Sequence, residues 1–164
     1  MTVGSTARAT RLTQRSAALA ARFDEILRTR MAGLPMLNPA LRVEAVGFEL
    51  LPPDAGDAAS PTALGILLTP WFMNLVLLPV QPVDGTSAVG RARMLRLQGR
   101  ALAFIGAHEP AVGAFAACSL FSPVFEFARQ ADALAMAQAV LAELRPAPRP
   151  ARRAFLLGRA GAAV

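Results

Sequence analysis

The sequence predicts an α+β domain in which a mostly antiparallel sheet of about five strands is flanked by an N-terminal and a C-terminal helix. An apolar fraction of 54% over 164 residues supports one domain with a substantial hydrophobic core. Helical periodicity occurs near each end, and short apolar or alternating runs bounded by Pro and Gly lie between. This order is typical of an α+β domain, and we expect both helices to cover one side of the sheet.

The N-terminal part divides into a basic arm and a helix. Residues 1–12 are small, polar and basic, which predicts a flexible arm. Residues 13–31 place Leu19, Phe23 and Ile26 on one face, which predicts an amphipathic helix. A glycine and a proline follow closely and end this helix.

The middle of the chain supplies the strands. Alternating or continuous apolar runs bounded by turn residues predict strands at residues 41–51, 64–69, 74–80, 91–98 and 101–107. The last two are separated by Gly-Arg and form a predicted strand pair.

The C-terminal part contains the second helix and a tail. Ser122-Pro123 is a possible helix start, with Ser as the cap and Pro in the first turn. Apolar residues at helical spacing predict a helix from Arg129 to Arg145. We therefore assign residues 13–145 to a single domain and residues 146–164 to a Pro/Arg-rich tail.

The net charge of +6 is concentrated at the two ends of the chain. Residues 1–22 hold four arginines and no acid, and residues 145–164 hold five arginines and no acid. The part between them has no basic recognition helix and no zinc-finger spacing, so we do not expect nucleic-acid binding. Residues 58–83 lack charge, but four prolines interrupt them, which favours buried strands over stable membrane insertion.

Catalytic and metal-binding residues are scarce. Cys118 is the only cysteine and His108 the only histidine, so we expect no disulfide, metal site or cofactor. A single cysteine fits a reducing compartment, and we expect a cytoplasmic protein. The alternative from another class is a thiol-dependent enzyme that uses Cys118 and His108.

Two apolar segments are candidates for binding a protein partner. Large adaptable side chains adjoin one another in both, and such side chains favour adaptable binding when they are exposed. Plain core packing is the alternative. The candidate precursor-binding residues are Trp71, Phe72, Met73 and Asn74 in the first segment, and Cys118, Phe121, Phe125 and Glu126 in the second.

Four stretches in order carry a family resemblance: LGILLTPWFMNLVLLP, FIGAHE, AACSLFSPVFEFARQADALAMA and ARRAFLLGR. With these, the chain closely resembles the HybE/HupJ family of [NiFe]-hydrogenase assembly chaperones over residues 14–160. The resemblance implies a protein without enzymatic activity that acts in the maturation of an exported uptake hydrogenase. Its implied partners are the small-subunit precursor, which carries a twin-arginine signal, and, as a second candidate, the large-subunit precursor. Such chaperones are expected to hold precursors in the cytoplasm until assembly is complete.

The tail contains a twin-arginine-like motif of its own. Arg152 and Arg153 are followed by one spacer and then by Phe155 and Leu156. A built-in copy of the signal would be a pseudosubstrate that occupies the signal-binding groove. The alternatives are a tail that anchors to the surface through Phe155 and Leu156, a tail that belongs to the binding surface, and coincidence.

Overall fold

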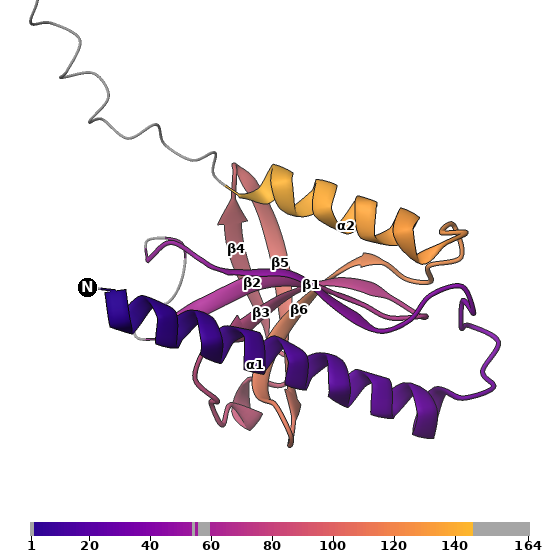
Figure 1. The fold of residues 1–164 in the computed structure, drawn as a ribbon, viewed down its shortest axis with the longest axis horizontal. Helices are drawn as coiled ribbons and strands as arrows, with labels where there is room; N and C mark the ends of the chain where they lie inside the picture. Colours follow the sequence, from indigo (N-terminus) through magenta and orange to yellow (C-terminus); the bar gives the residue numbers. More distant parts are fainter. Residues whose placement is uncertain (1, 54, 56–59, 146–164) are drawn as a thin grey trace, which may run out of the picture.

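The computed structural model describes residues 2–53, 55 and 60–145. Two helices and six strands follow one another along the chain (Figure 1). The elements are α1 (Thr2–Ile26), the π-helical segment η1 (Leu27–Met31), β1 (Glu44–Leu50), β2 (Thr62–Leu68), β3 (Met73–Pro79), the 3₁₀ turn η2 (Thr86–Ala88), β4 (Ala92–Leu97), β5 (Arg100–Glu109), β6 (Gly113–Phe121) and α2 (Gln130–Leu144).

The six strands form one sheet in the order β1-β2-β3-β6-β5-β4, and every neighbouring pair is antiparallel. The α+β fold with a helix at each end is therefore confirmed. The strand that the sequence analysis missed is β6, which lies between β3 and β5. The helix start predicted at Ser122-Pro123 is wrong, because β6 runs to Phe121 and α2 begins only at Gln130.

The two helices cover opposite faces of the sheet, so the expectation that both cover one side is wrong (Figure 1). Successive strand residues point to alternate faces, and the sheet therefore has two apolar faces to cover. Leu64, Ile66 and Leu68 of β2 pack with α2 in one cluster, the α2-side core. Leu67 of β2 packs with Leu19 of α1 in the other, the α1-side core.

Helix α1 begins eleven residues earlier than predicted, so the expected flexible arm over residues 1–12 is helical from Thr2. Leu12 and Leu19 are buried on the sheet. Arg15, only 7% exposed, donates from Nε to the carbonyl of Pro79 at 3.1 Å and from Nη1 to that of Val112. These contacts fix the first half of α1 to the ends of β3 and β6, which sequence composition alone does not reveal.

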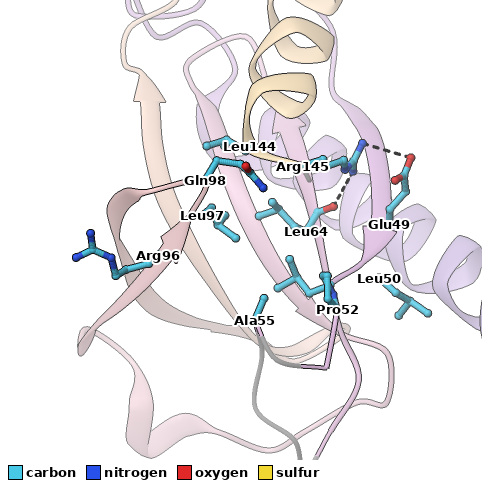
Figure 2. Close-up of a pocket in the computed structure, with 11 residues that line it drawn as sticks. Glu49, Leu50, Pro52, Ala55, Leu64, Arg96, Leu97, Gln98, Leu144 and Arg145 are labelled. Atoms are coloured by element: carbon cyan, nitrogen blue, oxygen red, sulfur yellow. Dashed lines mark hydrogen bonds and ion pairs between the residues drawn. The ribbon is translucent and has the colours of Figure 1, made fainter. Parts of the chain in front are cut away.

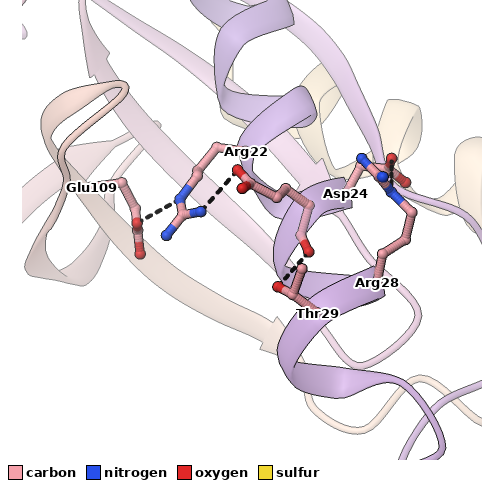
Figure 3. Close-up of polar contacts among 6 residues, drawn as sticks. Arg22, Asp24, Arg28, Thr29 and Glu109 are labelled. Atoms are coloured by element: carbon pink, nitrogen blue, oxygen red, sulfur yellow. Dashed lines mark hydrogen bonds and ion pairs between the residues drawn. The ribbon is translucent and has the colours of Figure 1, made fainter.

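An ion-pair cluster fixes the second half of α1 (Figure 3). Arg22 donates from Nε to Glu109 at the end of β5 at 2.8 Å and from Nη1 to Glu25 at 2.9 Å. Arg28 and Asp24 form a second pair one turn further on at 3.1 Å. The acids of this helix are thus already paired within the fold.

A two-residue turn connects β4 and β5, which confirms the predicted strand pair. Gln98 and Gly99 have φ values of 47° and 77°. Positive φ at both central residues is the requirement of a type I′ turn, which Gly99 meets without strain. Leu97 and Arg100 flank the turn as partners in the register, and this fixes which backbone groups of β4 point toward β5.

Candidate functional site

Three segments meet at one end of the sheet, on the right of Figure 1. They are residues 32–43 before β1, the β2–β3 turn at residues 69–72, and residues 122–129 between β6 and α2. We call this region the loop end. It contains Trp71 and Phe72 of the first segment that the sequence analysis selected and Phe125 and Glu126 of the second, whereas the other selected residues lie on the adjoining strands β3 and β6.

Asn38 holds the loop end together. Its side chain is buried, and Nδ2 donates to the carbonyls of Val124 at 3.0 Å and Phe127 at 2.8 Å. Its backbone N–H donates to the carbonyl of Pro70 at 2.7 Å. One residue therefore connects the neighbour of Trp71 with the segment that carries Phe125. The sequence analysis missed Asn38, whose side-chain partners lie 86 and 89 residues away.

Trp71 and Phe72 belong to an aromatic cluster on the α1 side of the sheet. Their rings lie 5.4 Å apart, and Phe23 of α1 lies 6.4 Å from Trp71 and 5.7 Å from Phe72. Trp71 and Phe72 are each half-buried. They combine packing with access to solvent, which suits a binding surface that is set in place before a partner arrives.

Met73 and Asn74 lie at the start of β3 and face opposite sides of the sheet. Met73 is fully buried in the α2-side core. It is therefore not an exposed contact residue, and packing accounts for its size and apolar character. Asn74 is half-buried, and its Oδ1 is buried without a hydrogen-bond partner among the described residues.

Cys118 and His108 are not brought together as a dyad. Ala117, the neighbour of Cys118, pairs with Ile105, which lies three residues before His108 on β5. His108 pairs with Ala114, so Cys118 lies four residues away along β6, or about 14 Å at a strand rise of about 3.4 Å per residue. Burial raises the pKa of the Cys118 thiol, which favours the unreactive protonated form. The geometry gives the thiol-enzyme alternative no support.

The segment after β6 divides into buried and exposed aromatic residues. Phe121 is half-buried against the α2-side core, and its ring lies 5.2 Å from that of buried Phe127 at an interplanar angle of 76°. Phe125 is 55% exposed, although both of its near neighbours Val124 and Phe127 are buried. Phe125 is thus held out into solvent by a segment that is fixed on either side.

Glu126 follows Phe125 directly and is exposed. Every other Asp or Glu that the structure describes lies within ion-pair distance of an arginine, except Asp84, which is highly exposed and lies 3.9 Å from His108. Glu126 forms neither an ion pair nor a side-chain hydrogen bond with the described residues. The loop end therefore presents an unpaired carboxylate beside an exposed aromatic ring. Leu34 and Met36, both exposed, add apolar surface to the same end.

A hollow of about 300 Å³ lies at the other end of α2 (Figure 2). Leu50, Leu97 and Leu144 contribute apolar lining. Arg145 closes one side, pairing with Glu49 at 3.3 Å and donating to the carbonyls of Leu64 at 3.1 Å and Gly47. No sequence-predicted site residue within the described part of the chain lines this hollow. The tail motif at Arg152, Arg153, Phe155 and Leu156 lies outside the described residues.

The fold is a small α+β domain whose loop end exposes an aromatic ring beside a carboxylate. The chain belongs to the [NiFe]-hydrogenase assembly chaperone HybE family, which it matches over residues 14–158. The family resemblance in the sequence is thereby confirmed.

Relatives and a solved structure agree with this assignment. The chain is 47% identical over 153 residues to the protein HoxT of Cupriavidus necator, with 84% of each chain covered. It is 42% identical over 126 residues to the hydrogenase expression/formation protein HupJ of Bradyrhizobium diazoefficiens, covering 77% of this chain and 69% of that protein. The solution structure of HybE from Escherichia coli shares the fold, with a TM-score of 0.58, 23% identity and coverage of 90% of this chain and 91% of that one. Among the described residues, no helix has the length and apolar character that crossing a membrane requires.

Proposed function

We propose that this chaperone binds subunit precursors of an exported [NiFe]-hydrogenase in the cytoplasm, including the twin-arginine signal of the small subunit, before export. The large-subunit precursor is the second proposed partner. The family and the names of its relatives, which concern hydrogenase formation and assembly, support the general role. The loop end supports the finer assignment to a signal segment.

The observation that carries this proposal is that exposed Phe125 lies next to Glu126, whose carboxylate has no ion-pair partner among the described residues. A twin-arginine signal presents arginines next to apolar side chains. The loop end offers a carboxylate next to aromatic rings, which is the complementary combination. An Arg guanidinium can form a bidentate, charge-assisted pair with a carboxylate. Apolar side chains of the signal would pack on Phe125, Trp71 and Phe72, which Asn38 holds at one end of the sheet.

Calorimetric titration with a synthetic peptide that contains Arg-Arg-Ala-Phe-Leu-Leu tests the proposal. Phe125→Ala and Glu126→Gln should each weaken binding, by roughly two- to tenfold for the carboxylate because an exposed ion pair is modest. The matched controls are Met94→Ala and Glu143→Gln, which change an exposed apolar residue and an exposed acid elsewhere. Thermal melts of all four proteins separate lost binding from lost folding. Equal binding by the loop-end and control variants would reject the loop end as the signal site.

We propose further that the tail motif is a pseudosubstrate that competes for this site. Short flexible tethers give effective concentrations of about 1 mM. A tail with an intrinsic affinity of about 10 µM would then lower the affinity for the signal peptide roughly a hundredfold. Deletion of residues 149–164 should therefore tighten peptide binding, and Arg152→Ala with Arg153→Ala should do the same.

The same titration distinguishes the alternatives for the tail. Unchanged affinity after deletion would reject significant occlusion. Weaker binding after deletion would mean that the tail forms part of the binding surface.

A further inference from the structure

The two edges of the sheet differ in how well they are protected. At the β1 edge, a bulge between Val46 and Glu49 interrupts the strand, and Gly47 there has a φ of 61°. Arg145 donates to the carbonyl of Gly47, and both helices contact β1. Bulges and covering elements are the usual ways in which proteins prevent an edge strand from pairing with another chain. The β1 edge is therefore closed.

The β4 edge keeps a continuous row of free backbone groups. In a hairpin with a two-residue turn, the flanking pair Leu97 and Arg100 is hydrogen-bonded, and bonded pairs then recur at every second residue. The bond from Gly106 N–H to the carbonyl of Arg91 at 2.9 Å fits this alternation. The N–H and C=O groups of Ala92, Met94 and Arg96 therefore point away from β5. Within the described residues, no backbone partner meets them.

The side chains along β4 are basic and apolar. Residues 85–108 contain four arginines and no acid. Arg93 and Arg96 differ by an odd number of positions, so they lie on opposite faces of the strand. Among the described residues, Arg91 and Arg93 form no ion pair. Met94 is 61% exposed.

A hollow adjoins the start of this edge. Its volume is about 200 Å³, and Arg91, Ala92 and Arg93 line it together with Leu77 and Ala116 of the sheet. Its lining extends across the face of the sheet from β4 to β3, so the hollow lies on the face beside this edge. Hydrogen-bonding groups and positive charge thus occur together on one edge, next to an apolar hollow on the adjoining face.

We propose that β4 binds an acidic extended segment of a partner protein as a seventh strand of the sheet. Main-chain hydrogen bonds give affinity in this mode of recognition, and alternate side chains give specificity. Charge selects the occupant. A second copy would bring two arginine-rich strands together without an acid, and residues 146–164 of this chain hold four arginines and no acid. The proposal is independent of the signal site, because it uses none of the loop-end residues.

NMR titration of the full-length chain tests this proposal with the capped peptide Glu-Val-Glu-Leu-Glu-Val-Glu as the probe. Amide shifts should concentrate on residues 92–97 and leave β1 unchanged. The same peptide with Gln in place of Glu should bind about tenfold more weakly, because it loses several exposed charge pairs. Added salt should reduce this difference.

Two variants of Met94 test the backbone contact. Met94→Pro removes an outward N–H and should weaken peptide binding at least tenfold, whereas Met94→Ala keeps that N–H and should change it less. Proline is tolerated on an edge strand at an outward position, and a thermal melt verifies folding. If Met94→Pro does not fold, a variant with Gln in place of Arg91, Arg93 and Arg96 tests the proposal instead. Its affinity for the Glu peptide should fall about tenfold.

The proposal is overturned if the Gln peptide binds as well as the Glu peptide, if the peptide shifts β1 amides, or if it causes no shifts on β4. Wild-type binding by folded Met94→Pro would also overturn it. Shifts on β4 that depend on protein concentration without any peptide would identify a second copy as the occupant and overturn it as well.

Discussion

The loop end and the β4 edge are both exposed, but they differ in how they are built. At the loop end, three segments distant in the sequence are connected by one buried residue, Asn38, through its side chain and its backbone N–H. At the β4 edge, a single hairpin determines the whole surface through its turn. The loop end offers aromatic side chains and an unpaired carboxylate, whereas the β4 edge offers backbone groups and arginines.

This difference teaches that one small domain can separate partner segments by charge. If both proposals hold, the loop end attracts cationic apolar segments through Glu126, and the β4 edge repels them through its arginines. Like charges placed against each other disfavour wrong partners as effectively as contacts favour correct ones. A precursor could then be held at two points with different chemistry, in one orientation.

The largest expected effect compares two methionines. Met73 is fully buried beneath the loop end, and Met94 is 61% exposed on the β4 edge. Met73→Ala should lower the free energy of unfolding by about 3 kcal/mol, because it removes buried methylenes and leaves a cavity. Met94→Ala should change it by less than about 0.5 kcal/mol. Urea denaturation measures the free energy of unfolding of both variants. Similar losses would mean that Met94 is buried and that the β4 edge is not exposed.

The next effect tests whether Asn38 makes the loop end one unit. Asn38→Ala removes three side-chain hydrogen bonds, two donated to the carbonyls of Val124 and Phe127 and one accepted from the N–H of Ala40. We expect a loss of about 2 kcal/mol in the free energy of unfolding. Hydrogen exchange should increase in residues 122–129 and stay unchanged on β4. Equal increases in both regions would show that they are not independent.

The strands and helices were predictable where a local pattern sufficed. The apolar runs at 64–69 and 74–80 correspond to β2 and β3. The helical spacing of apolar residues between Arg129 and Arg145 corresponds to α2. β6 was missed because six of its nine residues are small and because its place is determined by pairing with β3 and β5 on either side. Local composition does not contain that information.

The site was predictable only in part, for a related reason. Adjacent aromatic residues identified the two segments, and the structure places both at one end. The burial of Met73 depends on α2 covering that face of β3, and the role of Asn38 depends on partners far away in the chain. Neither can be inferred from spacing alone.

A smaller effect separates the two regions by charge. Glu126→Arg should weaken binding of the twin-arginine peptide roughly two- to tenfold, while Arg93→Glu should change it less than about twofold. Titrations at about 0.05 M and 0.5 M salt should show the difference shrinking, because exposed charges are screened. If both reversals change binding to the same extent, the peptide responds to net charge and not to a site at the loop end.

The smallest effect concerns Cys118 on β6. This strand lies between β3, which follows the β2–β3 turn of the loop end, and the β4–β5 hairpin. Burial raises the pKa of its thiol. The unfolded chain therefore loses this proton first, as pH rises past an ordinary cysteine pKa of about 8.5, while the folded chain keeps it. Stability should be fully present below that pH and should fall as pH rises toward the pKa of the folded state.

In this chain, the loss of stability caused by titration of Cys118 can be measured with little interference from other side chains. It contains no Tyr and no Lys, so Cys118 is the only side chain with an ordinary pKa between about pH 8 and 10. The free energy of unfolding from urea denaturation should decline over this range in the wild-type chain and stay nearly constant in Cys118→Ala. Because β6 pairs with both neighbouring strands, the decline should accompany faster hydrogen exchange in β3 and β5 alike. A pH-independent wild-type stability would mean that folding does not raise the pKa of Cys118. Exchange that increases on one side only would mean that β6 does not couple the two regions.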